Sequence, residues 1–399
     1  MMQENSQQII EKTNHFGAHN YHPKDVVIES AEGALVWDPE GRQYYDMLSA
    51  YSALNFGHRH PEIIAAAKEQ LDKVTLTSRA FHNAVLGEFF EKLCQVTGKD
   101  MVLPMNTGAE AVETALKTAR RWGVEVKGVA NGEQEIIVCE NNFHGRTIAI
   151  ISFSTDPDAR INYGPYAPGF HVIPYGDAAA LEAAITPNTV AFLVEPIQGE
   201  AGILMPPEGY LQQVREICTR HNVLMMADEV QTGFARTGDM FACDHEGVVP
   251  DIYILGKALG GGVMPLSAVV ANRDILGIYT PGSHGSTFGG NPLACACAIK
   301  ALELLVRDNY PQMAREKGEY FMAKLREINN EDILEVRGRG LLIGVEFKHS
   351  AVGYVKELIA HGVLAKETHE NTIRFAPPIV ISYEQMDDAC NRIAQVFSK

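Results

Sequence analysis

Residues 190–200 read VAFLVEPIQGE, residues 223–229 read VLMMADE, and residues 252–257 read IYILGK. Each stretch begins with a short apolar run, as buried strands do, and passes directly into polar residues. Residues 209–221 (GYLQQVREICTRH) lie between the first two and carry apolar residues at helical spacing, with a basic last turn. This alternation of strands and helices predicts βαβ units in a mostly parallel sheet, and therefore an α/β fold.

The flanking sequence extends this pattern and then changes. Residues 134–139 and 267–270 are two more predicted strands of the sheet. Beyond them we expect amphipathic helices and short strands at 301–308, 311–329, 341–347 and 372–375, with a closing helix from residue 383. We therefore predict an N-terminal segment (1–46) that packs with a small α+β domain (296–399), and a large domain (47–295).

The composition is that of a folded, acidic protein. Of 399 residues, 46% are hydrophobic, which excludes disordered, collagen-like and coiled-coil proteins. The 34 Lys and Arg against 50 Asp and Glu give a net charge of −16, which disfavours binding to nucleic acid or to an anionic membrane. The N-terminus lacks a basic segment followed by an apolar one, and no apolar stretch approaches the roughly 20 residues that cross a bilayer. We therefore expect a cytoplasmic protein.

The cysteines and two nearby histidines are interpreted as structural. The seven cysteines are odd in number, scattered and mostly within apolar runs, as expected for reduced, buried thiols. Cys295 and Cys297 are two positions apart on a predicted helix, so their side chains face different directions. His58 and His60 have no carboxylate or cysteine at a metal-ligand spacing, and we expect no metal site.

The polar residues that follow the strands are the first candidates for chemistry, because ligands of parallel α/β sheets bind beyond the carboxyl ends of the strands. Asp228 and Lys257 each follow a predicted strand, and one βαβ-like excursion between them can bring a carboxylate and an amine into one pocket. Such a pair suits pyridoxal 5′-phosphate (PLP): the amine forms a Schiff base and the carboxylate keeps the pyridine nitrogen protonated. The alternative is a structural Asp and a surface Lys.

A possible phosphate site lies at the start of a predicted helix, 109–122. Gly108 precedes this helix, whose free backbone N–H groups and positive dipole end suit an anion. Thr107 and Glu110 also match an ordinary N-cap pattern, so the sequence leaves both interpretations open.

Two further segments could contact a planar cofactor or its substrate. Phe143 and Arg146 lie just past a predicted strand, where a ring can stack on the cofactor and a guanidinium can hold a carboxylate. The alternative is a core Phe and a surface Arg. Residues 284–292 (HGSTFGGNP) are small and hydroxyl-rich, which suits either an anion site or an ordinary loop.

Fingerprints of other cofactor sites are absent from the sequence. It contains no P-loop and no H-E-x-x-H or G-x-S-x-G motif. Residues 338–344 (GRGLLIG) approach a dinucleotide fingerprint, but Ile343 stands where the third glycine belongs. The sequence therefore carries no motif for a competing cofactor, and the PLP interpretation of Asp228 and Lys257 stays open beside the structural one.

Six motifs in this order resemble the fold-type I, class III PLP-dependent aminotransferases. They are NTGAEA (106–111), NNFHGRT (141–147), EPIQGEAG (195–202), ADEVQTGFARTG (227–238), LGKALGGG (255–262) and HGSTFGGNP (284–292). The resemblance runs through nearly the whole chain. Four other segments resemble the ornithine δ-aminotransferases of that family: GAHNYHP (17–23), YSALNFGH (51–58), LTSRAF (76–81) and IRFAPP (373–378).

The resemblance implies a role for each residue at the ring of the cofactor. Lys257 would form the Schiff base with PLP, and Asp228 would pair with the pyridine nitrogen. Gln231 would contact the ring hydroxyl, and Phe143 would stack on the ring.

The resemblance also implies a site shared between subunits. Gly108 and Ala109 would bind the phosphate through their N–H groups, and Thr287 would reach in from a second subunit. The active form would then be a homodimer or a higher even-numbered homo-oligomer.

For the substrates, the resemblance implies L-ornithine as amine donor and 2-oxoglutarate as acceptor. Tyr21 and Arg146 would bind the α-amino and carboxylate end of ornithine, with Tyr51 lining the same pocket. Glu200 would shield Arg374 in this half-reaction and then release it to bind a carboxylate of 2-oxoglutarate. The products would be glutamate 5-semialdehyde, which cyclises to pyrroline-5-carboxylate, and glutamate.

Two other functions remain open from the sequence. An N-acetylornithine aminotransferase would share the cofactor residues and differ around Tyr21, Tyr51 and Arg146. A catalytically idle α/β protein could use the same sheet edge to bind a phosphate-bearing ligand. Lys257 argues against the second, because a binding protein does not need an amine at that position.

Overall fold

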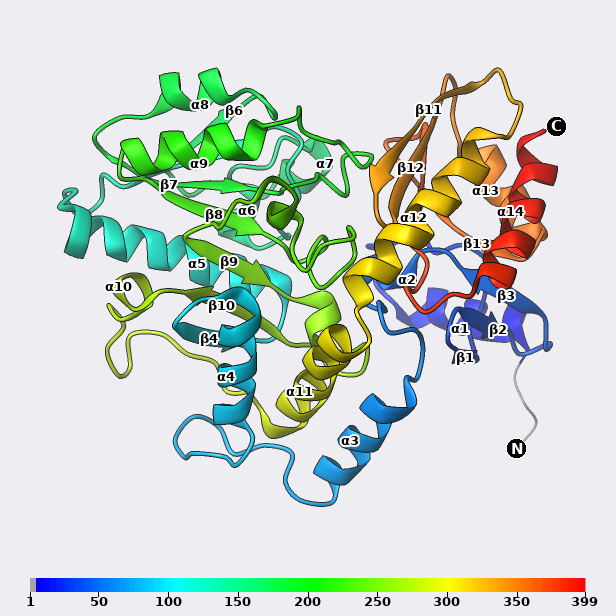
Figure 1. The fold of residues 1–399 in the computed structure, drawn as a ribbon, viewed down its shortest axis with the longest axis horizontal. Helices are drawn as coiled ribbons and strands as arrows, with labels where there is room; N and C mark the ends of the chain where they lie inside the picture. The colour runs from blue at the N-terminus through cyan, green and yellow to red at the C-terminus, as the bar shows by residue number, and fades with distance from the viewer. Residues whose placement is uncertain (1–4, 399) are drawn as a thin grey trace.

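A seven-stranded sheet forms the centre of the larger part of the molecule, in the computed structural model that describes residues 5–398 (Figure 1). Its strands, in spatial order, are β4 (Met101–Met105), β10 (Ser267–Ala271), β9 (Ile252–Leu255), β8 (Leu224–Asp228), β7 (Thr189–Val194), β5 (Glu135–Cys139) and β6 (Phe170–Ile173). Strands β9, β8, β7, β5 and β6 pair in parallel, whereas β10 runs antiparallel to both of its neighbours. The prediction of a mostly parallel sheet in an α/β fold is confirmed.

Helices cover both faces of this sheet, which explains why its central strands are mostly apolar. Every residue of β7 is buried: Val190 and Leu193 face the helix α5 (Gly108–Trp122) and Phe192 faces the helix α9 (Tyr210–Arg220). In Figure 1, α8 (Ala178–Ala184) and α9 lie on one side of the sheet and α5 on the other. Strands buried on both faces read as continuous hydrophobic runs rather than as alternating patterns.

Long helices lead from the large sheet to the C-terminal part. The helix α11 (Pro292–Arg307) packs on α3 (Pro61–Leu71) and α4 (Leu86–Thr97), and α12 (Tyr310–Arg326) follows it. The expected helix at 301–308 is thus the second half of a longer one. The proposed division between residues 295 and 296 falls inside α11 and stays a prediction.

Two small sheets build the part on the right of Figure 1. One has the order β1 (Ser30–Glu32), β2 (Leu35–Trp37), β3 (Gln43–Asp46) and β13 (Val363–Leu364). The other has the order β11 (Ile333–Arg339), β12 (Leu342–Phe347), β15 (Thr372–Phe375) and β14 (Lys366–Thr368). The strand β13, which follows α13 (Val352–Ala360) and precedes α14 (Tyr383–Phe397) in the chain, pairs in parallel with β3. This pairing places the N-terminal strands beside the C-terminal segment.

The sequence analysis did not predict several short strands, because they contain a proline or are too short to show an alternating pattern. The strand β4 contains Pro104, and β13 is only two residues long.

The cysteines behave as expected, because all seven are free and only Cys94 is not fully buried. The remaining short elements are α1 (Ser6–Phe16), α2 (Ser49–Ser52), η1 (Gly123–Lys127), α6 (Ile148–Ile151), α7 (Pro157–Arg160), η2 (Ala242–Glu246), η3 (Lys257–Gly260) and α10 (Arg273–Leu276).

None of the helices within residues 5–398 is long and apolar enough to span a membrane.

Candidate active site

A cavity of about 200 Å³ lies at the carboxyl ends of the central strands. Its walls come from the segments after β5 and β7, the end of β8, the start of η3 and the N-terminus of α5. The lining residues are Gly108, Ala109, Phe143, His144, Gly145, Glu195, Ile197, Glu200, Asp228, Val230, Gln231, Thr232 and Lys257. The position agrees with the general rule for ligands of parallel α/β sheets.

Asp228 and Lys257 both face this cavity. Asp228 is the last residue of β8, and its partner in β9 is Ile254, which places Lys257 three residues further on at the same edge. Lys257 begins the turn η3 with φ of +45°, a left-handed conformation that is unusual for a lysine and typical of strained functional positions. Burial is the main cause that lowers the pKa of Lys257 to about 8; the charge of Glu200 opposes this shift, and the charge of Arg374 acts in the same direction as burial.

His144 is a site residue that the sequence analysis did not single out. Its side chain is buried, and its Nδ1 lies 2.7 Å from Asp228 Oδ2. Burial alone would lower the pKa of His144, but the hydrogen bond and the charge of Asp228 raise it above its usual value. A protonated His144 donates to the carboxylate and favours its ionised form. The signal was present in the motif at 141–147, but only the fold brings this histidine to Asp228.

Glu195 is a second carboxyl group beside the cavity. It accepts hydrogen bonds from the backbone N–H of Phe143 at 2.8 Å and of Gly199 at 3.3 Å. Burial raises its pKa to about 7, with the charge of Asp228 acting in the same direction. Glu195 therefore ties the segments after β5 and β7 together around the cavity.

The N-terminus of α5 forms the opposite end of the cavity. Thr107 caps the helix by accepting from the N–H of Glu110 at 3.2 Å, while Glu110 accepts from the N–H of Thr107 at 2.7 Å. The N–H groups of Gly108 and Ala109 have no acceptor among residues 5–398 and lie at the cavity wall. The N-cap and the phosphate-site interpretations are thus compatible, because the cap satisfies one donor and leaves two others free.

The close approach of the 141–147 segment to α5 requires glycine at position 145. A Cβ atom on Gly145 would lie 2.8 Å from the Ala109 Cβ, and its φ of +127° is available mainly to glycine. A larger residue here would push the segment with Phe143 and His144 away from the cavity.

An arginine masked by a carboxylate lies at the edge of the cavity. Arg374 Nη1 is 2.7 Å from Glu200 Oε1, and Gln231 Nε2 donates to the same oxygen at 3.1 Å. Burial raises the pKa of Glu200, but the charge and hydrogen bond of Arg374, together with the charge of Lys257 and the hydrogen bond from Gln231, outweigh burial and hold this pKa below its usual value. The guanidinium also stacks on Tyr51, 4.7 Å from the ring centre. Its buried Nε has no acceptor within residues 5–398, so Arg374 keeps an unused donor.

The other expected substrate residues lie outside this cavity. The Arg146 guanidinium is 5.8 Å from the ring centre of Phe143 and 5.9 Å from that of Tyr21. Tyr21 is 66% exposed and lines a larger hollow of about 740 Å³ between α1 and residues 19–27. The lining of that hollow includes no strand end and a single carboxylate, Asp25, so we assign the chemistry to the smaller cavity.

Thr287 is exposed and does not line the cavity of its own chain. It lies in the segment between β10 and α11, next to Ser286, which accepts a hydrogen bond from Asn106 at 2.9 Å. The structure of one chain therefore does not test the expected contact with a second subunit.

Within residues 5–398 there is no cluster of His, Cys, Asp and Glu side chains suited to a metal ion. His58, considered above as a possible ligand, instead lies 2.8 Å from Asp46 Oδ2 through its Nε2 atom. This contact satisfies the histidine and agrees with its structural interpretation.

Comparison with known proteins identifies the family. The class-III aminotransferase family model matches residues 16–397. Over 388 residues the chain is 63% identical to an ornithine aminotransferase of Brevibacillus brevis, covering 97% of both proteins. The chain therefore belongs to the class-III aminotransferases, which use PLP.

Two solved structures are similar over almost the whole chain. An ornithine aminotransferase of Toxoplasma gondii, with PLP at partial occupancy in its active site, has a TM-score of 0.98 at 45% identity, covering 99% of this chain and 95% of that one. An acetylornithine aminotransferase of Elizabethkingia anophelis has a TM-score of 0.90 at 48% identity, covering 99% of each chain. The fold is therefore similar to that of an ornithine aminotransferase and to that of an acetylornithine aminotransferase.

Proposed function

We propose that this protein transfers the δ-amino group of L-ornithine to 2-oxoglutarate. The products are glutamate, and glutamate 5-semialdehyde that cyclises to pyrroline-5-carboxylate, a compound that connects arginine metabolism with proline biosynthesis. The observation that carries the proposal is the arginine masked by Glu200 at the edge of a cavity that holds Lys257. The 63% identity to a named ornithine aminotransferase supports the same substrate.

The cavity fits PLP by the chemistry of its donors and acceptors. When bound, PLP supplies an aldehyde that condenses with amines and a protonated ring that withdraws electrons from the bond being broken. Gly108 and Ala109 offer free N–H groups to the phosphate, and Asp228 offers a carboxylate to the ring nitrogen. Phe143 would offer its ring face to the cofactor, and Gln231 would offer its side-chain amide to the ring hydroxyl.

Lys257 is the group that holds the cofactor and then moves the proton. An amine with a pKa of about 8 has a neutral fraction of about one-tenth at pH 7 and about one-half at pH 8, far more than an ordinary lysine, and the neutral form is the nucleophile and the base. We assign to its Nζ the removal of a proton from Cδ of ornithine. His144 and Asp228 act together at the far end, where the histidine keeps the carboxylate charged.

The two ends of ornithine differ in charge, and the residues around the cavity match that difference. We assign Tyr21 and Arg146 to the α-amino and carboxylate end, with Tyr51 lining the same pocket. This orientation leaves the δ-amine toward Lys257. The contacts of the Arg146 guanidinium with the rings of Phe143 and Tyr21 support the assignment, because they join the substrate residues to the cavity wall.

Glu200 and Arg374 allow one pocket to take two unlike substrates. With ornithine, Glu200 neutralises Arg374, and no substrate carboxylate is needed there. With 2-oxoglutarate, release of Glu200 frees the guanidinium to bind one carboxylate while Arg146 binds the other. The unused Nε donor of Arg374 supports this role, because a bidentate carboxylate pairs with two N–H groups.

We further propose a homodimer, or a higher even-numbered oligomer, in the cytoplasm. Thr287 is exposed and is not among the residues that line the cavity of its own chain, which leaves its hydroxyl available to the phosphate site of a partner subunit. The net charge of −16 supports an enzyme of small molecules rather than of nucleic acid.

The test is a panel of amine donors with 2-oxoglutarate, in which the rate of glutamate formation is measured for every donor and the cyclised product of ornithine is also trapped with o-aminobenzaldehyde. Ornithine is expected to give the trapped product, whereas Nα-acetylornithine is expected to react poorly because its acyl group removes the positive charge near Tyr21. The similarity to an acetylornithine aminotransferase makes this comparison the decisive one. Equal rates with both donors would refute the substrate assignment.

A further inference from the structure

Four residues form one row across the C-terminal sheet β11-β12-β15-β14. Arg337 on β11 pairs with Gly344 on β12, Gly344 pairs with Arg374 on β15, and Arg374 pairs with Lys366 on β14. Side chains of directly paired residues point to the same face of a sheet. The row therefore places Arg337 on the same face as Arg374, two strands away.

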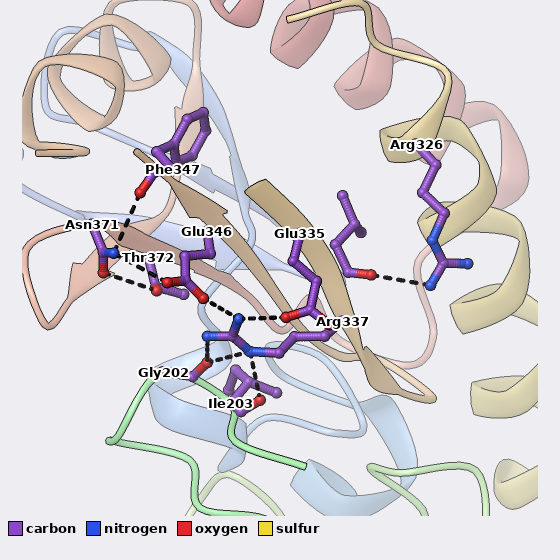
Figure 2. Close-up of polar contacts among 10 residues, drawn as sticks. Gly202, Ile203, Arg326, Glu335, Arg337, Glu346, Phe347, Asn371 and Thr372 are labelled. Atoms are coloured by element: carbon purple, nitrogen blue, oxygen red, sulfur yellow. Dashed lines mark hydrogen bonds and ion pairs between the residues drawn. The ribbon is translucent and has the colours of Figure 1, made fainter. Parts of the chain in front are cut away.

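The loop of residues 199–205, which we call the Glu200 loop, lies against this face. Arg337 donates from Nη2 to the Gly202 carbonyl at 2.7 Å and from Nε to the carbonyls of Gly202 and Ile203, each at 3.1 Å. Figure 2 shows the guanidinium between these carbonyls on one side and Glu335 and Glu346 on the other. Arg337 thus joins the Glu200 loop to the sheet that carries Arg374.

Gly344 makes the close contact between loop and sheet possible. A Cβ atom at this position would lie 3.2 Å from Ile203 Cβ and 3.3 Å from the Gly202 carbonyl oxygen. Gly344 lies between Arg337 and Arg374 in the row, and any residue with a side chain at this position would push the Glu200 loop away from the sheet. It ends the GRGLLIG segment that the sequence left without a function.

Two residues of the edge strand β14 make further contacts with the Glu200 loop and with Tyr51. Lys366 donates from Nζ to the Tyr51 hydroxyl at 2.9 Å, and the Thr368 hydroxyl donates to the Glu200 carbonyl. The Glu200 loop is therefore fixed at Glu200 itself by Thr368 and two residues further on by Arg337. Between these contacts, the Glu200 carboxylate forms its ion pair with Arg374.

We propose that Arg337 is a positioning residue that sets Glu200 against Arg374 by holding the Glu200 loop on the sheet. Arg337 contacts neither the cavity nor Arg374, so it acts through the loop alone. Without the hydrogen bonds from Arg337, the Glu200 loop becomes more mobile and the ion pair between Glu200 and Arg374 weakens. The affinity of the site for ligands with a second carboxylate then increases. This inference rests on the proposed function for its biological meaning, while the loop contact is independent of it.

The experiment compares Arg337→Met and Gly344→Ala with wild type, and uses Glu335→Gln as the matched control. Glu335 contacts the same guanidinium at 2.9 Å but is exposed and does not touch the loop. Gly344→Ala moves the loop without removing a charge, so it tests the inference even if Arg337→Met folds poorly. All proteins are measured as full-length holoenzymes.

Three readouts separate positioning from general damage. Hydrogen exchange of the amides in the Glu200 loop is expected to accelerate in both variants and not in the control. Glutarate, a dicarboxylate that cannot react, is expected to bind between roughly 2-fold and 30-fold more tightly by calorimetry, the range typical for residues that modulate a coupling. The ratio of kcat/KM for glutamate to that for ornithine is expected to rise, whereas structural damage would lower both.

Unchanged glutarate affinity and unchanged exchange in both variants would overturn the inference. Equal changes in the Glu335→Gln control would also overturn it, because that residue does not reach the loop. Absence of ornithine turnover in wild type would instead refute the proposed function, and the exchange and glutarate measurements would still decide the role of Arg337.

Discussion

Asp228 is held by two hydrogen bonds while it faces the cofactor cavity. One oxygen accepts from His144 and the other from the backbone N–H of Val230, at 2.7 Å and 3.1 Å. The carboxylate is thus fixed in direction as well as in charge, and electrostatic groups fixed in advance give the largest contributions to catalysis.

Replacement of this charge tests its role. Asp228→Asn keeps the size of the side chain but cannot stabilise a protonated ring nitrogen, and we expect kcat to fall about 10²- to 10³-fold. Glu229→Gln is the matched control, because the neighbouring residue points to Thr232 and to the backbone of Ala242 and Cys243 rather than to the cavity. Similar losses in steady-state kinetics for both variants would contradict a specific role of Asp228.

The lowered pKa of Lys257 predicts a pH dependence. Below about 8 the side chain is mainly an ammonium ion, which has no lone pair for attack, and above about 8 it is mainly the free amine. The rate at which cofactor-free protein attaches PLP covalently should therefore rise with pH and level off above about 8. Borohydride trapping followed by mass spectrometry of the Lys257 peptide measures this rate, and a midpoint near 10.5 would contradict the effect of burial.

At the scale of an element, the short turn α2 has an unusual backbone. Its residues Ser49, Ala50, Tyr51 and Ser52 all have positive φ, between +47° and +71°. Asp46 holds the start of the turn by accepting from the N–H groups of Leu48 and Ser49 at 2.9 Å and 2.8 Å. The turn presents Tyr51 to Arg374, so backbone strain is located at the substrate side of the site.

This strain is measurable at an exposed position. Ala50 has φ of +47° and ψ of +47°, where an L-residue costs about 1–2 kcal/mol relative to glycine. After subtraction of the greater entropy of glycine in the unfolded chain, Ala50→Gly should raise the free energy of unfolding by about 0.5–1 kcal/mol. Ala53→Gly, at φ of −83°, should lower it by a similar amount, and chemical denaturation measures both. Destabilisation by Ala50→Gly would show that the left-handed turn is not strained.

At the scale of the whole molecule, the proposed sharing of Thr287 predicts complementation between inactive subunits. Lys257→Ala removes the amine, and Thr287→Ala removes the hydroxyl that we assign to the partner's phosphate. In a mixed dimer, one site combines Lys257 of one chain with Thr287 of the other and is therefore intact. Random mixing of equal amounts should restore about a quarter of the wild-type sites.

The measurement is activity at limiting PLP after the two variants are unfolded and refolded together, with light scattering to give the mass. Each variant refolded alone is the control. If the mixture is no more active than the mean of the two controls, Thr287 serves its own chain or no site at all.

Much of the central sheet could be predicted from the sequence, because buried strands are local runs of apolar residues. The strand β9 lies at the predicted residues 252–255, and α14 starts at the predicted residue 383. The strands β7 and β8, predicted at 190–194 and 223–226, differ from these bounds by one or two residues at each end that moved. The cavity residues Asp228, Lys257, Gly108 and Phe143 could be found for the same reason, since they follow strands or open a helix. The partners of these residues could not be predicted, because no local pattern links His144 to Asp228.

The sequence by itself determined the α/β class, the positions along the chain of five strands of the large sheet and the chemical groups at their ends, since these depend on neighbouring residues. Only the tertiary structure decided which groups meet. Glu200 reaches Arg374 across 174 positions of the chain, and Arg337 reaches Gly202 across 135. Such contacts depend on strand register and on the packing of the small sheet beside the large one, and neither is encoded in a local run of residues.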